Sequence, residues 1–134
     1  MFFRRSRIRQ WDIAFIVSYD ELDAELIKDA LLWANAPKSI ISRVEDGVLA
    51  GRLNEGFCYS NPALRRTVMG IGSTEHGYES LNTAVHEIVH AMQGMAIEDG
   101  MALDGEEVAY LAGSISELIS DIICEVACPH CREK

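Results

Sequence analysis

The chain has 134 residues, the size of a single domain that can bury its own core. Hydrophobic residues make up 49% and charged residues 25%, which excludes a disordered chain, a collagen and a coiled-coil rod. The net charge of −9 argues against nucleic acid as a partner, because an acidic surface repels phosphates. No apolar run approaches the roughly 18 residues that span a bilayer. We therefore expect no membrane partner, no export signal and a cytoplasmic location.

Both ends of the chain differ in composition from its middle. Residues 1–9 hold four arginines and no acidic residue, and we expect them to form a basic, solvated tail. Residues 124–134 hold three of the four cysteines and predict a Cys-rich tail. Without an export signal, cysteines are expected as free thiols or metal ligands rather than as disulfides. We predict one domain over residues 1–134 with a short tail at each end.

The first half of the chain predicts a strand followed by two helices. Residues 10–17 are rich in β-forming residues and predict a strand. Ser18 and Glu21 form a capping box that opens a helix. Pro37 begins a shorter helix that ends at the turn signal of residues 46–47.

The second half predicts two strands and then two long helices. Residues 51–59 and 66–71 are short β-rich segments with a turn at residues 61–62, and the arginines of the second segment favour an edge position. The helices run from residue 73 or 80 to 94 or 96, and from 106 to 126. This order predicts an α+β domain in which helices cover one face of a small, mostly antiparallel sheet.

The first of the two long helices contains the motif HExxH, formed by His86, Glu87 and His90. At 100° per residue the two imidazoles lie about 40° apart on one face, one turn above the other. Both can therefore bind one Zn²⁺ ion. Glu87 can reach a water at the metal without binding the metal, which is the position of a general base. We predict His86 and His90 as zinc ligands and Glu87 as the catalytic base.

The apolar residues of the same helix predict which side enters the core. One stripe is expected to be buried, and it consists of Leu81, Ala84, Val85, Ile88, Met92 and Met95. His86 and His90 lie about 140° and 180° from Leu81 around the helix axis. The two histidines are therefore expected on the side away from the core.

Two histidines leave a catalytic zinc site one protein ligand short. No third histidine follows at the spacing of HExxHxxGxxH, so a glutamate at the start of the last helix is the expected ligand. Glu106 heads a line of small residues that would let the two helices pack closely: Ala109, Gly113, Ser116 and Ser120. Glu107 is the alternative ligand, although it also completes a capping box with Asp104. A simpler interpretation, that both acids only stabilise the helix N-terminus, also stays open.

Residues 82–93 (NTAVHEIVHAMQ) and 106–113 (EEVAYLAG) together resemble the small zincin-like metallopeptidases that are common in phage and prophage genomes. Those proteins belong to the glutamate-zincin (gluzincin) class. The resemblance implies a Zn²⁺ cofactor bound by His86, His90 and Glu106, with Glu87 as the base. It also implies that residues 66–71 form the edge strand on which a substrate peptide lies. A phage-encoded enzyme of this kind is expected in the cytoplasm of the host cell.

These parts predict a hydrolase that cuts peptide bonds in a peptide or protein substrate. Zinc would polarise the scissile carbonyl, and Glu87 would carry a proton from water to the leaving amine. A donor to the developing oxyanion is also needed, and Tyr78, His76 and Tyr110 are the candidates. A chain of this length has little room for the second lobe of large zincins, so we expect a shallow groove, a wall supplied by a partner, or an oligomer.

The C-terminal cysteines predict a second, structural metal site. Cys124, Cys128 and Cys131 have the spacings CxxxC and CxxC, which can place thiolates on one metal ion. Cys58 or His130 would be the fourth ligand. The alternative is that the tail carries reduced thiols and binds no metal.

Two other functions remain as alternatives to a peptidase. One is a non-catalytic zincin-like module of phage origin that binds a protein partner. The other is a zinc-knuckle adaptor for nucleic acid built from the Cys-rich tail, although the acidic composition argues against it. HExxH favours Zn²⁺ and also accepts Mn²⁺, Co²⁺ or Ni²⁺.

Overall fold

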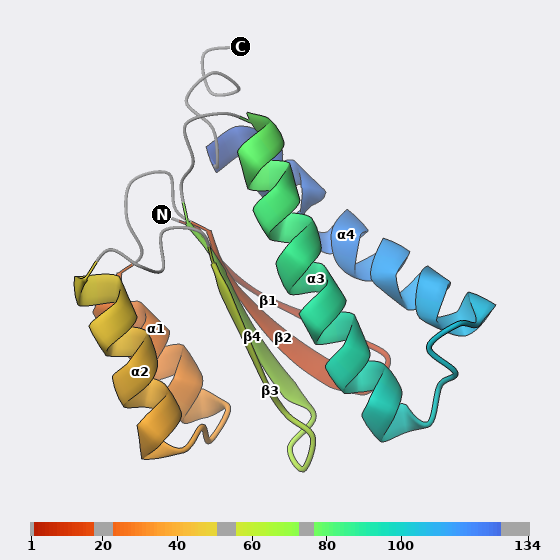
Figure 1. The fold of residues 1–134 in the computed structure, drawn as a ribbon, viewed down its shortest axis with the longest axis horizontal. Helices are drawn as coiled ribbons and strands as arrows, with labels where there is room; N and C mark the ends of the chain where they lie inside the picture. Colours follow the sequence, from red (N-terminus) through yellow and green to blue (C-terminus); the bar gives the residue numbers. More distant parts are fainter. Residues whose placement is uncertain (1, 18–22, 51–55, 73–76, 127–134) are drawn as a thin grey trace.

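The computed structural model describes residues 2–17, 23–50, 56–72 and 77–126. Within these ranges the elements are β1 (Phe2–Ile8), β2 (Trp11–Val17), α1 (Ala24–Trp33), α2 (Lys38–Leu49), β3 (Phe57–Asn61), β4 (Arg66–Ile71), α3 (Gly77–Asp99) and α4 (Glu106–Val126). The sheet lies between the pair α1–α2 and the pair α3–α4 (Figure 1). The predicted α+β class is confirmed, but the helices cover both faces of the sheet rather than one. None of the helices in these ranges is long and apolar enough to span a membrane.

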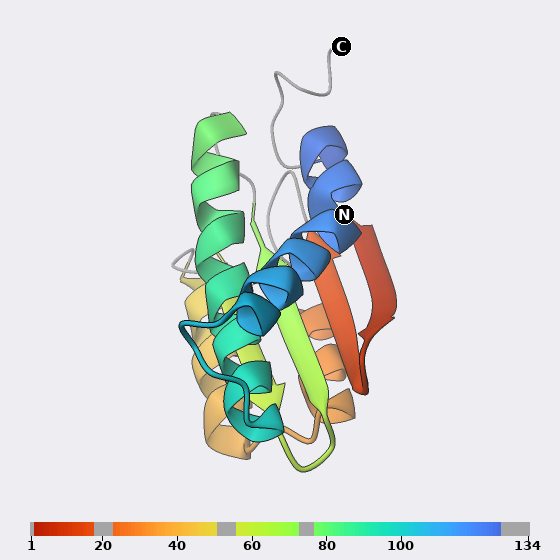
Figure 2. The ribbon, with the colours of Figure 1, turned by 90° about the vertical axis from the view of Figure 1, so that its right-hand side faces the viewer.

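The strand order is β1-β2-β4-β3, so β1 and β3 are the edges and β2 and β4 are central (Figure 2). The pairs β1–β2 and β3–β4 are antiparallel and β2–β4 is parallel, so the sheet is mostly antiparallel as predicted. The prediction that residues 66–71 form an edge strand is wrong. All residues of β4 after Arg66 are buried. The strand carries mostly apolar side chains on both faces, so both faces are stabilised by packing against other elements, as in a central strand.

The arginine-rich N-terminus is a strand and not the solvated tail that its composition predicts. Residues 2–8 form β1, which pairs with β2 along its whole length. Arg4 donates hydrogen bonds to the Leu118 carbonyl (3.0 Å) and to the Asp121 carboxylate (3.2 and 3.3 Å) of α4. Arg9, just after the strand, pairs with Glu107 at 2.9 Å. These partners are distant in sequence, and so the composition alone could not show that the arginines attach β1 to α4.

The helix starts in the first half of the chain are set by Asp23 and Pro37. The Asp23 side chain caps α1 by accepting hydrogen bonds from the backbone N–H groups of Glu25 (2.9 Å) and Leu26 (3.2 Å). The expected capping box of residues 18–21 lies outside the described residues. Pro37 is the residue before α2, as its fixed φ favours. A turn was predicted at residues 61–62; Asn61 is still part of β3, and the connection to β4 begins at residue 62.

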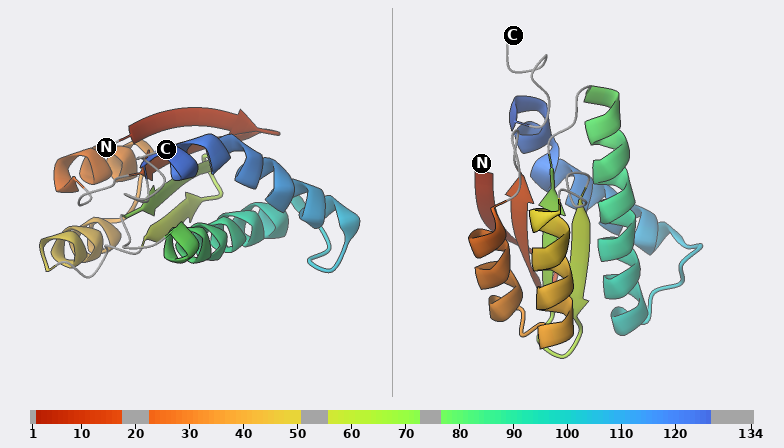
Figure 3. Two further views of the ribbon diagram at one scale, coloured as in Figure 1. Left: turned by 90° about the horizontal axis from the view of Figure 1, so that it is seen from above. Right: turned by 60° about the vertical axis from the view of Figure 1, so that its left-hand side comes forward.

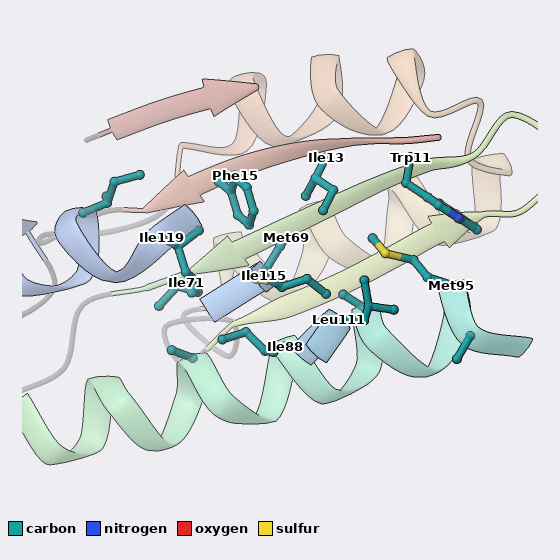
Figure 4. Close-up of a cluster of buried hydrophobic side chains, with 14 of the residues drawn as sticks. Trp11, Ile13, Phe15, Met69, Ile71, Ile88, Met95, Leu111, Ile115 and Ile119 are labelled. Carbon is teal, nitrogen blue, oxygen red and sulfur yellow. The ribbon is translucent and has the colours of Figure 1, made fainter. Parts of the chain in front are cut away.

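Two cores fill the spaces on either side of the sheet. The larger core lies between the sheet and α3–α4 (Figure 4), and its labelled members are Trp11, Ile13, Phe15, Met69, Ile71, Ile88, Met95, Leu111, Ile115 and Ile119. The smaller core lies under α1 and α2 and includes Ala14, Ile16, Ile27, Leu31 and Val68. Successive residues of β2 therefore enter opposite cores, which explains the unbroken apolar run in this strand.

Asp99 ties the C-terminal end of α3 to the sheet. Its carboxylate accepts a hydrogen bond from Trp11 Nε1 (3.0 Å) and is ion-paired with Arg65, and its side chain is only 16% exposed. Desolvation alone would raise the pKa of Asp99. The hydrogen bonds from Arg65 and Trp11 outweigh that effect and lower the pKa below its ordinary value of 3.8.

We expect Asp99→Asn to lower the free energy of unfolding by about 1–3 kcal/mol at pH 7. The pKa of Asp99 is lower in the folded state than in the unfolded state. The carboxylate therefore stabilises the fold above the unfolded pKa, and this contribution is lost as the pH falls through the folded pKa. Urea unfolding at pH 7 and in acid measures the effect, with Asp29→Asn on the exposed side of α1 as the control. A difference in the free energy of unfolding between Asp99→Asn and the wild-type protein that stayed constant into acid would contradict this explanation.

Candidate functional site

Helix α3 carries the HExxH motif and packs on β3 and β4. Its buried apolar residues are Ala84, Ile88, Ala91, Met95 and Ala96. Leu81 and Val85, which were expected in this stripe, are 60% and 50% exposed. The buried stripe runs instead through Ala84, Ile88, Ala91 and Met95, and Val85 lies about 100° around the helix axis from Ala84.

His86 and His90 lie on the exposed side of α3 and converge on one point, as their spacing predicts. Their Nε2 atoms are 3.2 Å apart and their rings are arranged edge to face. Two nitrogen ligands at 2.0–2.1 Å from a tetrahedral ion are themselves about 3.3 Å apart. The pair therefore already has the separation required by two neighbouring positions of a zinc site.

Glu87 points away from solvent, toward the residue that precedes β3. It is only 6% exposed, although both neighbouring histidines are exposed. Burial raises the pKa of the Glu87 carboxyl, and the His86 and His90 rings offset part of that rise. A carboxylate with a raised pKa is a better proton acceptor, which suits the general base predicted at this position.

A pocket of about 190 Å³ opens beside this base and is lined by Gly56, Asn82, Thr83, His86 and Glu87. Asn82 and Thr83 lie one helical turn before His86 and Glu87, so their i−4 spacing could have identified them in the sequence. Gly56 comes from the other side of the pocket, and no pattern in the sequence connects it to α3. The pocket gives a small polar group access to Glu87 and His86 together.

Cys58 on β3 lies close to Glu87 and is largely buried. Burial and the negative charge of Glu87 raise the pKa of the Cys58 thiol to about 12, and a hydrogen bond with Ser60 offsets part of the rise. The group is therefore a neutral thiol packed against the larger core. Its predicted partners in a structural metal site, the side chains of Cys124, Cys128, Cys131 and His130, lie outside the described residues, so that site stays a prediction.

The expected third ligand is not assembled with the histidines in the part of the chain that the structure describes. Glu106 and Glu107 are both exposed in the first turn of α4, which projects beyond α3 (Figure 3). Glu107 is paired with Arg9. No three His, Cys, Asp or Glu side chains within these ranges form a group that could hold a metal ion. Glu106 and Glu107 therefore stay predictions as ligands.

The argument that placed Glu106 near the histidines is wrong in one step. The line of small residues does not pack on α3, because all of its members are exposed: Ala109, Gly113, Ser116 and Ser120. Helix α4 packs instead through its wide apolar face, which includes Val108, Leu111, Ile115, Ile119 and Ile122. Burial of this larger apolar area outweighs the close approach that small residues permit.

Tyr110, one candidate for the oxyanion donor, is 72% exposed on α4. His76 and the side chain of Tyr78 lie outside the described residues. Comparisons with models of known families, with curated proteins and with solved structures found no match to this chain. The functional proposal therefore depends on the motif and on the geometry of α3 and β3.

We expect Gly56→Ala to lower the free energy of unfolding by about 1–3 kcal/mol and to displace the Glu87 side chain. Gly56 has φ +152°, and an added Cβ would lie 2.8 Å from the Gly70 carbonyl oxygen and 3.2 Å from Glu87 Cγ. Gly113→Ala is the matched control, because an added Cβ there meets nothing within 4 Å. This control is expected to stabilise α4 by about 0.5–1 kcal/mol. Thermal unfolding of both variants measures these changes. Destabilisation by Gly113→Ala would contradict the prediction, because it would mean that another helix packs closely against Gly113.

Proposed function

We propose that this chain is a zinc-dependent peptidase of the zincin-like kind. The observation that carries the proposal is the 3.2 Å separation of His86 and His90 Nε2 atoms on the helical turn that also presents the buried Glu87. Two convergent imidazoles favour a metal ion, and a carboxylate held beside them favours hydrolysis. The resemblance of residues 82–93 and 106–113 to small phage metallopeptidases supports the same function.

The residues of α3 have separate roles in the proposed reaction. His86 and His90 hold the Zn²⁺ ion, which supplies Lewis-acid chemistry toward a peptide carbonyl when bound. Glu87 accepts a proton from the attacking water and delivers it to the leaving amine. The pocket beside Asn82 and Thr83 gives the reacting group access to this carboxylate.

We place the substrate peptide along β3. This strand pairs only with β4 in the described sheet, so the backbone groups on its outer edge are free to bind an extended peptide. Helix α3 contacts β3, and an added Cβ on Gly94 of α3 would lie 3.3 Å from Ser60 Oγ of β3. A peptide on this edge therefore runs beside the helix that carries the histidines. The free thiol of Cys58 suits a reducing compartment, and we place the activity in the cytoplasm.

A second candidate function is a non-catalytic zincin-like module that binds a protein partner. The placement of Glu106 and Glu107 favours it, because the described residues supply the metal with only two histidines. A module of this kind would use the β3 edge for binding and would not cut its partner. Hydrolysis distinguishes the two candidates.

The test is hydrolysis of an unfolded protein, such as casein, by the full chain loaded with zinc. Fragments identified by mass spectrometry are the expected result, and they should disappear with a zinc chelator and return when zinc is added back. Absence of zinc-dependent fragments from a protein that binds one zinc ion would overturn the peptidase and leave the binding module.

A further inference from the structure

The arginines of β1 divide between the two faces of the sheet, because successive side chains of a strand point to opposite faces. Arg4 lies on the face covered by α4, where it is paired with Asp121. Arg5 and Arg7 lie on the other face, since their cross-strand partners are Ala14, a member of the smaller core, and Asp12. Arg4 therefore joins β1 to α4, whereas Arg5 and Arg7 lie on the face of the sheet that α1 and α2 cover.

On the face of α1 the arginines gather around an aromatic ring. The guanidinium carbons of Arg5 and Arg66 lie 4.9 Å and 5.0 Å from the centre of the Trp33 ring. Arg66 also donates a hydrogen bond to the Trp33 carbonyl at 2.6 Å. Contacts of this kind hold guanidinium groups in place without neutralising them.

A shallow pocket of about 370 Å³ lies at this cluster and is lined by Arg5, Ser6, Arg7, Asp12 and Trp33. Its volume is within the range of small-molecule sites. The only acid in the lining is Asp12, whose carboxylate is 4.0 Å from Arg7. Among the described residues no carboxylate is within ion-pair distance of Arg5 or Arg66.

The local charge is opposite to that of the whole chain. Arg5, Arg7 and Arg66 together exceed Asp12 by two positive charges, whereas the chain carries −9. Guanidinium groups bind phosphate and carboxylate through paired N–H donors, and Arg5, which Trp33 already holds in place, loses little freedom on binding. An anion would also relieve the repulsion between the three cations.

We infer that the pocket formed by Arg5, Arg7 and Trp33 binds a small molecule through a phosphate or carboxylate group. The site lies on the opposite face of the sheet from α3, so it is independent of the proposed zinc chemistry. The flat ring of Trp33 forms one wall, and Ser6 adds a hydroxyl to the lining.

Tryptophan fluorescence tests this site, because the chain has two tryptophans and Trp11 is fully buried. Inorganic phosphate and citrate are titrated separately into the full chain, with sodium chloride used to keep the ionic strength constant. A saturable change that disappears in Trp33→Phe is expected for one or both anions. Phosphate alone would identify a phosphate ligand, and citrate alone a carboxylate ligand.

Arg5→Gln and Arg7→Gln are each expected to weaken this binding at least tenfold, because each removes one charged donor. Arg43→Gln is the matched control, since Arg43 is exposed on α2 outside the pocket. Arg7 has a 65% exposed side chain, so its replacement gives a folded variant even if Arg5→Gln is unstable. An equal response to chloride, or equal affinities in the Arg7 and Arg43 variants, would overturn the site.

Discussion

Glu87→Gln is expected to lower kcat for peptide hydrolysis by at least about 100-fold while the protein keeps its zinc. The amide has nearly the same shape as the carboxylate and fits the same space beside Gly56, but it cannot accept a proton from water. Zinc binding should persist because His86 and His90 are unchanged and both remain on the exposed side of α3. Steady-state kinetics together with zinc content measured by mass spectrometry check both parts.

Glu98→Gln is the matched control for this experiment. Glu98 lies on the same helix and is exposed, so its replacement should change neither hydrolysis nor zinc content. If zinc-dependent hydrolysis is present and Glu87→Gln leaves it intact, Glu87 is not the base. If the wild-type protein binds zinc and a partner but cuts nothing, the non-catalytic module is the better explanation.

His86→Ala is expected to weaken zinc binding by at least about 100-fold, because it removes one of two nitrogen ligands whose separation matches a tetrahedral site. His90→Ala should have the same effect. Zinc stoichiometry and affinity, measured by mass spectrometry and by competition with a chelating dye, check the prediction. Gln93→Ala, at an exposed position of the same helix, is the control that should keep the zinc.

The Cys128→Ala/Cys131→Ala double variant separates this site from the predicted Cys-rich site. One zinc ion that is lost only with the histidine variants would mean that the tail carries thiols. Two zinc ions, one lost with each set of variants, would establish a second, structural site. Zinc that survives His86→Ala but is lost with the cysteines would contradict the zincin site.

The elements with strong local signals are those that the sequence predicts well. The bounds of α4 match the prediction at both ends, because its apolar period is continuous and wide. Strand β4 covers the predicted residues, and helix α3 contains the predicted motif but continues to Asp99, past the expected end at residue 94 or 96. Strand β1 was missed because the four arginines of residues 1–9 resemble a solvated segment, and the α4 partners of Arg4 and Arg9 become visible only in three dimensions. The edge position of β3 could not be predicted for the same reason, since strand order depends on contacts between distant segments.

In the candidate site too, features set by local helical geometry could be predicted, and features set by contacts between distant segments could not. The convergence of His86 and His90 follows from helical geometry alone, and the sequence predicts it correctly. The pocket beside Glu87 depends on where β3 passes α3, so Gly56 could not be predicted. The position of α4 depended on a competition between small and apolar faces, and the apolar face determines the packing. The sequence argument for Glu106 lacked this information.

The parallel pairing of β2 with β4 has a consequence for how the protein reaches its folded state. The segment between these strands contains α1, α2 and β3, so its ends must meet before the centre of the sheet exists. Closing such a loop costs chain entropy before any contact repays it, and contacts between distant residues slow folding. Helix α3 can bury Glu87 only against the finished β3–β4 pair. All four strands of the described sheet precede α3 in the chain, so the strands leave the ribosome before the HExxH residues do, and the burial of Glu87 completes only when α3 packs on the sheet.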